Sequence, residues 1–417
     1  MSTTTKKDVL VLGAGMVGIS AAVHLQQRGR SVALVDRRGP AEETSHGNGG
    51  IIQREGVVPY MFPREWGEVL SYALGRGTDA HYHLSALPRL APYLFRYWRA
   101  STPAGKAAST RALAKLVEQC LVEHEALAES AGVTGMFRRT GYIRAYRSQE
   151  KLVASQAEDE ATRRDYGITS VLLDAAGFAA LEPHVKFDFV GAVHMTDPMS
   201  VADPSALGKA YADLFVKLGG SLVEGEARAL EATGSGWRIP TRSGWLEAPE
   251  AVVALGPWSD DLTRAQGLSI PMGFKRGYHM HYRAEGNATM SRPVIDTKYG
   301  YCITPMMKGI RITTGAEFAD RDAPPTPVQL DAVEPVARSI FPLGARLDDT
   351  PWLGRRPCLP DMLPVIGPVP GKKGLWLDFG HHHLGFTLGP VSGRLLADMM
   401  TGETPMIDPT PYRVDRF

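Results

Sequence analysis

Three consecutive histidines, His381, His382 and His383, stand between two glycines in the stretch LDFGHHHLGFTLGP. Three imidazoles together raise the question of a metal site. Neighbouring side chains point to opposite faces of a strand, and in a turn they diverge, so three histidines in a row rarely bind one ion. We therefore expect no metal here, and we interpret the run as a loop whose backbone contacts a ligand.

A second group of residues carries a clearer chemical signal, because Gly13, Gly15 and Gly18 have G-x-G-x-x-G spacing. Gly13 permits a tight turn, Gly15 allows a pyrophosphate to approach the backbone, and Gly18 allows a helix to pack closely on a strand. The N-terminus of that helix offers free N–H groups and the positive end of its dipole to phosphates. Asp36 follows about 20 residues later, where an acid can bind a ribose hydroxyl. The pattern predicts a dinucleotide site.

The segment 36–50, DRRGPAEETSHGNGG, favours FAD as the dinucleotide. Its last six residues, 45–50, are mostly small, so that the backbone can come close to a ligand, with polar groups between them. We interpret this segment as a loop that passes under a flavin and its ribityl–phosphate chain. A flexible surface turn is the alternative interpretation.

Separated motifs along most of the chain resemble the FAD-dependent D-amino-acid dehydrogenase family, within the D-amino-acid/glycine/sarcosine oxidase superfamily. GAGMVG, VDRR and ETSHGNGG resemble the opening of that family, and AVVALGPWS (251–259) resembles its second flavin motif. KGIRITTGAE (308–317), WLGRRPCLPDMLPVIG (352–367) and the closing GHHHLG resemble its remaining motifs. The resemblance implies oxidative deamination of a D-amino acid. A hydride passes from Cα to flavin N5, and the imine is hydrolysed to a 2-oxo acid or, if cyclic, released.

The resemblance also implies which side chains contact the substrate. A guanidinium can donate two parallel hydrogen bonds to a carboxylate, and Arg356 in GRRP matches the arginine that does so in the family. Arg311, inside GIRIT, is a second candidate, although a charge in a strand can simply face solvent. Tyr278 is expected near the substrate and Tyr301 is a candidate wall residue. His381 is the histidine of the G-H-x-x-x-G motif, and no obligatory catalytic base is expected.

The resemblance implies non-covalent binding of FAD. A covalent link through His46 is the alternative, because some dimethylglycine- and sarcosine-oxidising relatives carry a flavin-bonded histidine there. The expected cofactor-binding residues are Gly13, Ala14, Gly15, Met16, Val17, Gly18, Asp36, Arg37, Arg38, Thr44, Ser45, His46, Asn48, Gly49, Gly50, Ala227, Gly256, Trp258, Gly380, His381, His383, Leu384, Gly385 and Thr387.

The elements that must position these residues begin with a βαβ unit. Residues 8–12 form a short apolar run typical of a buried strand, 19–27 have helical periodicity that ends at Gly29, and 31–35 form a second strand. Residues 391–400 predict a helix after the histidine loop. We expect its dipole to favour the negative charge of a reduced flavin.

The flavin motifs lie at both ends and in the middle of the 417 residues, so two interleaved domains are expected. The fold class is α/β, with a Rossmann-like FAD-binding domain and a mixed-sheet α+β substrate domain that covers the flavin. Within the second domain, 104–131 predicts helix and 275–282 (KRGYHMHY) predicts a strand. Alternation puts Tyr278 on one face of that strand and His279 on the other. The expected boundaries are 1–75, 196–270 and 345–417 for the first domain, and 76–195 and 271–344 for the second.

The composition is that of a soluble globular protein, with 44% hydrophobic and 22% charged residues and a net charge of +1. No basic stripe suggests a nucleic-acid partner. Cys120, Cys302 and Cys358 have no CxxC spacing and fit a reducing compartment. No signal peptide and no spanning segment is predicted. We expect a cytoplasmic protein, with contact at the inner face of the membrane as an alternative.

The expected partners are a small amino-acid substrate and an electron acceptor such as a quinone or an electron-transfer protein. Small or cyclic D-amino acids, such as D-proline or hydroxy-D-proline, are preferred because no acidic residue clearly stands where a cationic side chain would bind. One alternative is a sarcosine- or glycine-type amine oxidase that uses O2. An alternative of another class is a non-catalytic dinucleotide-binding module.

Overall fold

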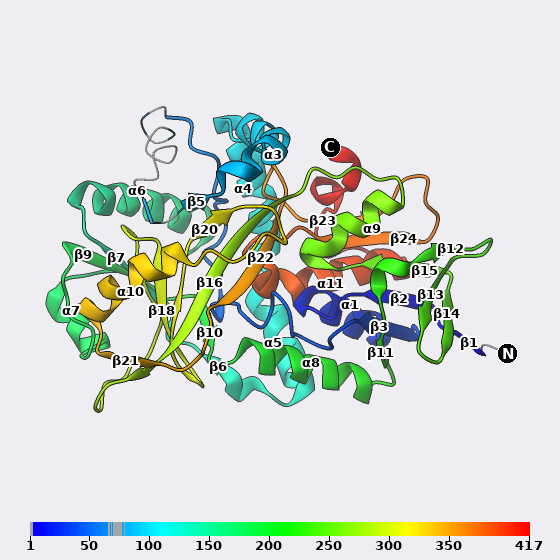
Figure 1. Cartoon of the computed structure of the whole chain (residues 1–417), viewed down its shortest axis with the longest axis horizontal. Helices are drawn as coiled ribbons and strands as arrows, with labels where there is room; N and C mark the ends of the chain where they lie inside the picture. The colour runs from blue at the N-terminus through cyan, green and yellow to red at the C-terminus, as the bar shows by residue number, and fades with distance from the viewer. Residues whose placement is uncertain (1–2, 66, 68, 70–76, 79) are drawn as a thin grey trace.

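The structure is a computed structural model that describes residues 3–65, 67, 69, 77–78 and 80–417 (Figure 1). Two sheets organise the chain. A six-stranded sheet with both termini of the chain near it lies in one half of Figure 1, and a larger mixed sheet lies in the other half. Within the described residues, no helix combines the length and the apolar character required to cross a bilayer.

The six-stranded sheet contains the first glycine motif. Five of its strands are parallel and the last, β23, pairs antiparallel to β24 at one edge. This is the α/β dinucleotide-binding arrangement that the βαβ pattern predicted. In spatial order the strands are β11 (Ser221–Glu224), β3 (Val32–Asp36), β2 (Val9–Leu12), β15 (Glu250–Val253), β24 (Leu375–Phe379) and β23 (Val365–Pro368).

Both faces of this sheet are covered, which explains the uninterrupted apolar run of β2. Val9 and Val11 belong to a core shared with α1 (Met16–Gln27), α8 (Pro204–Lys217) and α11 (Gly385–Thr401). Leu10 and Leu12 pack on the other face against a second layer of strands. That layer has the order β1 (Thr3–Lys6), β14 (Gly244–Ala248), β13 (Trp237–Thr241) and β12 (Glu231–Ala232).

The larger sheet has eleven strands among the described residues, and its central member is the twelve-residue β16 (Gly273–Ala284). Strand β22 (Trp352–Cys358) pairs with β16 and so connects the two halves of the molecule. The other strands are β5 (Ala80–Tyr82), β20 (Ala316–Phe318), β19 (Gly309–Thr313), β18 (Tyr301–Met306), β17 (Val294–Asp296), β7 (Tyr142–Tyr146), β9 (Gly191–Met195), β8 (Ser170–Leu173) and β21 (Leu343–Arg346).

A small third group of strands lies between the halves. It has the order β4 (Ile51–Ile52), β10 (Met199–Val201) and β6 (Phe137–Arg138), and it holds the chain just after the loop 45–50. Among the described residues, the other α-helices are α3 (Leu87–Ala100), α4 (Pro103–Val117), α5 (Cys120–Ala131), α6 (Gln149–Tyr166), α7 (Ala175–Leu181), α9 (Ser259–Ala265) and α10 (Val328–Ile340).

Two segments lie on the other side of the boundaries expected from the sequence. Helices α4 and α5 were expected in the substrate domain, but Leu113, Leu116 and Leu127 belong to the core under α1 and α11. Strand β22 was expected in the FAD-binding domain, but it is part of the large sheet. Spacing along the chain identifies the helix and the strand, whereas their packing partners depend on contacts between distant segments.

Helix α11 is longer than predicted, because it begins at Gly385 rather than near Val391. Its glycines and Pro390 resemble a loop in the sequence, yet they allow close packing. A Cβ on Gly393 would lie 2.6 Å from the backbone nitrogen of Ala21 in α1. The histidine loop therefore passes directly into the N-terminus of α11.

Candidate active site

The glycine turn between β2 and α1 has the geometry that the motif predicts. Gly13 has φ +104°, and a Cβ there would lie 2.5 Å from the carbonyl oxygen of Ala254 on the neighbouring strand. The amide of Ala14 donates to Asp36 Oδ2 at 2.9 Å, so the acid at the end of β3 fixes the turn. The N-cap residue of α1, Gly15, makes no side-chain cap. The first turn of this helix therefore offers backbone donors to a phosphate.

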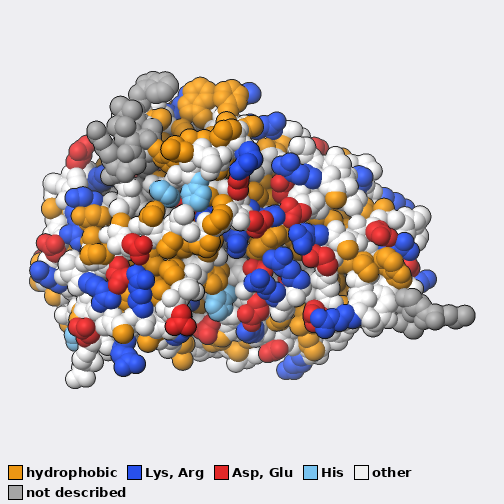
Figure 2. Space-filling view, viewed as in Figure 1, with side chains coloured by type: hydrophobic (Ala, Val, Ile, Leu, Met, Phe, Trp, Pro, Cys, Tyr) orange, Lys and Arg blue, Asp and Glu red, His pale blue; other side chains and the backbone are white. Residues whose placement is uncertain are grey.

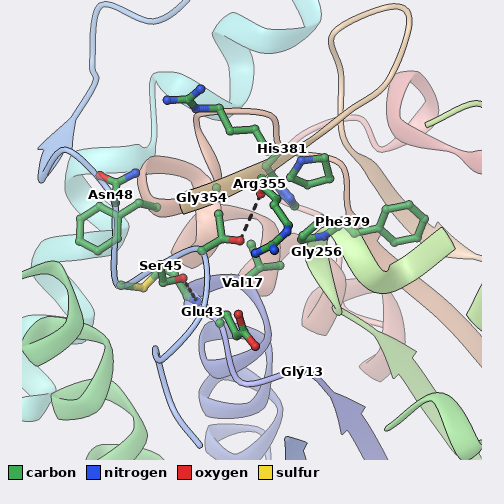
Figure 3. Close-up of a pocket in the computed structure, with 18 of the residues that line it drawn as sticks. Gly13, Val17, Glu43, Ser45, Asn48, Gly256, Gly354, Arg355, Phe379 and His381 are labelled. Carbon is green, nitrogen blue, oxygen red and sulfur yellow. Dashed lines mark hydrogen bonds between the residues drawn. The ribbon is translucent and has the colours of Figure 1, made fainter. Parts of the chain in front are cut away.

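A single pocket extends from this turn to the start of β22, with about 1550 Å³ of empty space that includes its opening to solvent (Figure 3). Its lining includes residues of both the glycine turn and the histidine loop. The expected residues that line it are Gly13, Gly15, Met16, Val17, Asp36, Arg37, Thr44, Ser45, Asn48, Gly49, Ala227, Gly256, Trp258, Tyr278, Arg356, Gly380, His381, His383 and Gly385.

Nine expected residues do not line the pocket: Ala14, Gly18, Arg38, His46, Gly50, Tyr301, Arg311, Leu384 and Thr387. Some of them support it from behind. Gly18 faces Gly13, where an added Cβ would lie 1.9 Å from the Gly13 carbonyl oxygen. The hydroxyl of Thr387 accepts from the backbone nitrogen of Gln53 at 3.1 Å, which ties α11 to the chain after β4.

The mouth of the pocket is cationic around one indole ring. The guanidinium of Arg37 lies 4.6 Å from the ring centroid of Trp258. Arg321 and Arg355 lie 6.0 and 5.9 Å from the same centroid. Arg355, the neighbour of Arg356 in the GRRP motif, also lines the pocket. Cations beside an aromatic platform fit an anionic dinucleotide at this end.

Arg356 on β22 lines the part of the pocket that also contains His383 of the histidine loop. Its Nη1 donates to the carbonyl oxygens of Gly315 at 3.0 Å and Arg276 at 3.3 Å. No carboxylate of the described residues forms an ion pair with it. Burial lowers the pKa of Arg356, although the guanidinium of arginine stays charged in proteins. Gly277 on β16 leaves room for it, because a Cβ there would lie 2.8 Å from both terminal nitrogens.

The histidine loop closes the same end of the pocket. His382 has φ +51°, and its amide donates to the Pro357 carbonyl oxygen at 3.0 Å. Burial lowers the pKa of His381 and of His383 to about 3, so both rings are neutral at pH 7. Helix α11 then starts at Gly385 without a side-chain cap. The loop therefore presents neutral rings and the positive end of a helix dipole to the pocket.

An acid that the sequence analysis missed lies under this loop. Asp378 is fully buried at the end of β24, and its Oδ1 lies 3.4 Å from His381 Nε2. Burial raises the pKa of Asp378 well above its ordinary value, which favours the protonated carboxyl group. The only sequence signal for it is an acid that ends a strongly apolar strand.

Tyr278 borders the pocket, but its hydroxyl is bound elsewhere. It donates to Glu317 Oε2 at 2.9 Å and accepts from the backbone nitrogen of Thr326 at 2.7 Å. Alternation along β16 explains this, because Gly277 and His279 face the FAD-binding half while Tyr278 packs in the core beside α10. Tyr278 therefore lines the pocket as expected, while its hydroxyl is held by Glu317 and Thr326. Tyr301 is buried in the same core and lies outside the pocket lining.

Arg311 forms a hydrogen bond to the loop 45–50 but does not line the pocket. Its Nη1 donates to the Asn48 carbonyl oxygen at 2.6 Å, and its Nε donates to His281 Nε2 at 2.9 Å. Because that nitrogen accepts, the ring proton lies on Nδ1, 2.7 Å from Asp348 Oδ2. Arg311 is only 5% exposed, and burial lowers its pKa to about 10. It positions the loop rather than facing solvent or the pocket.

His46 is not among the residues that line the pocket, although its neighbours Ser45 and Gly47 are. Its ring centroid lies 6.2 Å from that of Trp352, and the next residue, Gly47, has no room for a side chain because Trp352 covers it. This placement disfavours a covalent link through His46.

Converging metal ligands occur elsewhere in the described part of the chain. His81, His83 and Glu317 bring one ligand atom each within 4.8 Å of the others, whereas the histidine loop forms no such group. Glu317 already forms an ion pair with the fully buried Arg276.

The chain after β4 contributes two residues that the sequence analysis missed. Gln53 lines the pocket, and its Nε2 donates to Glu55 Oε1 at 3.2 Å. Burial raises the pKa of Glu55 to about 7, although hydrogen bonds from Tyr142 and Gln53 lower it in part. A loop that follows a glycine-rich motif is the only signal for these residues in the sequence.

The raised pKa of Glu55 predicts a pH-dependent stability. The neutral acid is favoured in the folded state, so its contribution is full below pH 4.5 and is lost as the pH rises through about 7. Glu55→Gln should therefore raise the free energy of unfolding by roughly 2 kcal/mol at about pH 8.5, and change it little at about pH 5. Denaturant unfolding at both pH values measures this. Glu129→Gln, at an exposed position, is the control, and parallel pH profiles of E55Q and the natural protein would contradict the prediction.

Comparison with known proteins extends these observations. The family model described as FAD dependent oxidoreductase (DAO) matches residues 8–399. A D-amino-acid oxidase of Bradyrhizobium diazoefficiens is 29% identical, over 99% of both chains, and a D-amino acid dehydrogenase of the same organism is 30% identical, over 98% of both chains. Among solved structures, glycine oxidase from Geobacillus kaustophilus superimposes with a TM-score of 0.77 at 22% identity, over 99% of each chain. L-proline dehydrogenase from P. horikoshii gives a TM-score of 0.74 at 19% identity, over 100% of this chain and 98% of that one.

Proposed function

This chain belongs to the DAO family of FAD-dependent oxidoreductases, and we propose that it oxidises a small or cyclic D-amino acid and passes the electrons to an acceptor other than O2. The cofactor, when bound, takes the hydride that leaves Cα as the amino acid becomes an imine. Arg356 carries the proposal for the substrate. It is a cation in the pocket lining close to His383, with backbone carbonyls as its hydrogen-bond partners.

The proposed roles of the chain follow from this geometry. The glycine turn and the N-terminus of α1 bind the pyrophosphate, and Asp36 binds the ribose. Arg356 holds the substrate carboxylate and so fixes the direction of its Cα–H bond. The N-terminus of α11 stabilises negative charge at the pyrimidine edge of the flavin. Binding of FAD is proposed to be non-covalent, since His46 lies outside the pocket.

The neutral surroundings of Arg356 favour a small or cyclic substrate side chain. Gln53, Ile51, Phe386 and His383 line this end, and the pKa of His383 is lowered to about 3 by burial. The ionisable acids among the described lining residues, Asp36, Glu43 and Glu226, lie toward Arg37 and Trp258 instead. Of the acids near this end, Asp378 is buried with a raised pKa and Glu55 lies behind Gln53 with its pKa raised to about 7, so we propose that the site does not select a cationic side chain. The D configuration is favoured by the named relatives at 29% and 30% identity.

Anaerobic reduction tests the substrate. Purified yellow protein is mixed without O2 with D-proline, L-proline, D-alanine, D-lysine, glycine or sarcosine, and the flavin absorption band is followed. We expect D-proline or D-alanine to bleach it, and L-proline and D-lysine to fail. If no amino acid bleaches the band, the chain is a non-catalytic dinucleotide-binding module. Acid precipitation of the same sample should leave the flavin in the supernatant.

Reoxidation tests the acceptor. The reduced protein is mixed either with air-saturated buffer or with a quinone analogue, and the return of the flavin band is timed. We expect the quinone analogue to act faster. Reduction by sarcosine or glycine, followed by faster reoxidation with O2, would instead establish the amine oxidase alternative, which the glycine oxidase fold likeness also allows.

A further inference from the structure

Helix α3 carries an apolar stripe on its outer face. Leu84, just before the helix, is 74% exposed, and Phe95 and Trp98 are 58% and 38% exposed. With the exposed Pro88 and Ala91 they stand at intervals of four, three, four and three residues, which is one side of a helix. Figure 2 shows hydrophobic side chains gathered on the upper edge of the molecule, where Figure 1 places α3.

None of the hydrophobic clusters formed by the described residues includes Leu84, Phe95 or Trp98. The opposite side of α3 supplies the residues that hold the helix in place, because Tyr93 and Tyr97 are buried against Cys358 and Met362. Single exposed hydrophobic residues are ordinary, whereas large ones aligned along a helix mark an interaction surface.

The charged residues on α3 itself all have one sign. Helix α3 contains Arg89, Arg96 and Arg99 and no acidic residue. Arg89 forms an ion pair with Asp320, while Arg96 and Arg99 form none with the described residues. Arg64 adds a further cation, with its guanidinium 4.8 Å from the ring centroid of Trp98.

We propose that this surface of α3 docks the protein on a bilayer that contains anionic lipids. A helix that lies in the membrane interface combines Trp, Phe and Leu on one face with Arg or Lys beside them, and it binds by apolar burial together with attraction to anionic headgroups. The arginines of α3 without a partner supply that attraction. A second copy of the chain would place these like charges against one another, which disfavours a dimer through the same surface.

The surface lies next to the proposed substrate end of the pocket. Tyr93 fills the space above Gly273 at the start of β16, and Tyr97 accepts a hydrogen bond from Lys275 at 3.0 Å. Tyr60, which is 67% exposed, has its ring centroid 5.1 Å from that of His383 in the pocket lining. Docking through α3 therefore brings this end of the pocket close to the membrane, where a lipid-soluble acceptor is concentrated.

Vesicle sedimentation with the FAD-loaded protein tests the inference. Vesicles of phosphatidylcholine alone are compared with vesicles that also contain phosphatidylglycerol. We expect binding to the anionic vesicles that weakens as salt is added. Phe95→Ser with Trp98→Ser should lower the partition coefficient by about tenfold or more. Arg96→Gln with Arg99→Gln should lower it by about fivefold for each arginine removed.

Matched controls separate the surface from general effects. Val171→Ser with Leu172→Ser removes two side chains that are 50% and 54% exposed on β8, and Arg283→Gln removes an exposed arginine at the end of β16. These variants should bind as the natural protein does, and all variants should keep their flavin content and Tm. Absence of binding to anionic vesicles would overturn the inference. So would equal losses in the controls, or a concentration-dependent dimer that F95S abolishes. Vesicle binding needs no turnover, so its failure is separate from failure of the proposed reaction.

Discussion

Replacing Arg356 by methionine is expected to lower kcat/KM for the amino-acid substrate by about a thousandfold, while flavin remains bound. The reason is that loss of one partner of a buried, hydrogen-bonded charge pair costs on the order of 4 kcal/mol, and each 1.4 kcal/mol is about tenfold in rate. Arg356→Lys keeps the charge but loses the fork of parallel donors, so an intermediate value is expected. Rapid-mixing measurement of anaerobic flavin reduction reports the loss directly.

Two controls make this prediction specific. Arg283→Met changes an exposed arginine and should leave reduction unchanged. An amine that lacks the carboxylate should react slowly with the natural protein and should lose little more in R356M. Because Arg356 also donates to the carbonyl oxygens of Arg276 and Gly315, Tm and flavin content must be measured beside the rates. Full activity of R356M with intact flavin would show that the carboxylate is bound elsewhere.

The second large effect is expected at the cofactor end, where Gly13→Ala should yield protein without FAD. Gly13 has φ +104°. Because it has no Cβ, the Ala254 carbonyl oxygen can lie where a side chain would begin. A left-handed backbone and a contact of 2.5 Å both oppose any side chain. We expect the FAD affinity to fall by about a hundredfold or more, which corresponds to on the order of 3 kcal/mol of strain.

The flavin-to-protein ratio after purification and titration of the apoprotein with FAD both measure this effect. Gly135→Ala is the matched control, because Gly135 is exposed and a Cβ there meets no atom within 4 Å. It should bind FAD as the natural protein does. Normal FAD affinity in G13A would mean that the turn relaxes without loss, and the assigned role of this glycine would be wrong.

Local sequence patterns predicted the cofactor half well, for a physical reason. The strand, the glycine turn, helix α1 and Asp36 are neighbours along the chain, and their hydrogen bonds connect residues within one βαβ unit. Periodicity also predicted β16 and the helices α4 and α5. Apolar spacing does not state what a helix packs against, so the contacts of α4 and α5 with α11 could not be predicted from the sequence.

Only the tertiary structure shows which face of strand β16 is turned toward the pocket. Alternation along β16 separates Tyr278 from His279, but only the position of α10 and of the FAD-binding half decides which of them is turned away from the pocket. Tyr278 borders the pocket, but its hydroxyl is bound to Glu317, a partner that alternation alone does not predict. Gly277 carried a readable signal, since a glycine inside a strand often marks a close approach, here by Arg356.

For the three histidines, too, some properties follow from the sequence alone and others only from the tertiary structure. The sequence alone determined that adjacent imidazoles diverge, that glycines flank them and that a helix follows, because these depend on bond geometry and on neighbours along the chain. Only the tertiary structure determined that His381 lies beside the buried Asp378, that His383 lies beside Tyr60, and that an unpaired arginine from β22 shares their pocket. Burial and contacts between distant segments set the charge of each group, and no local pattern encodes them.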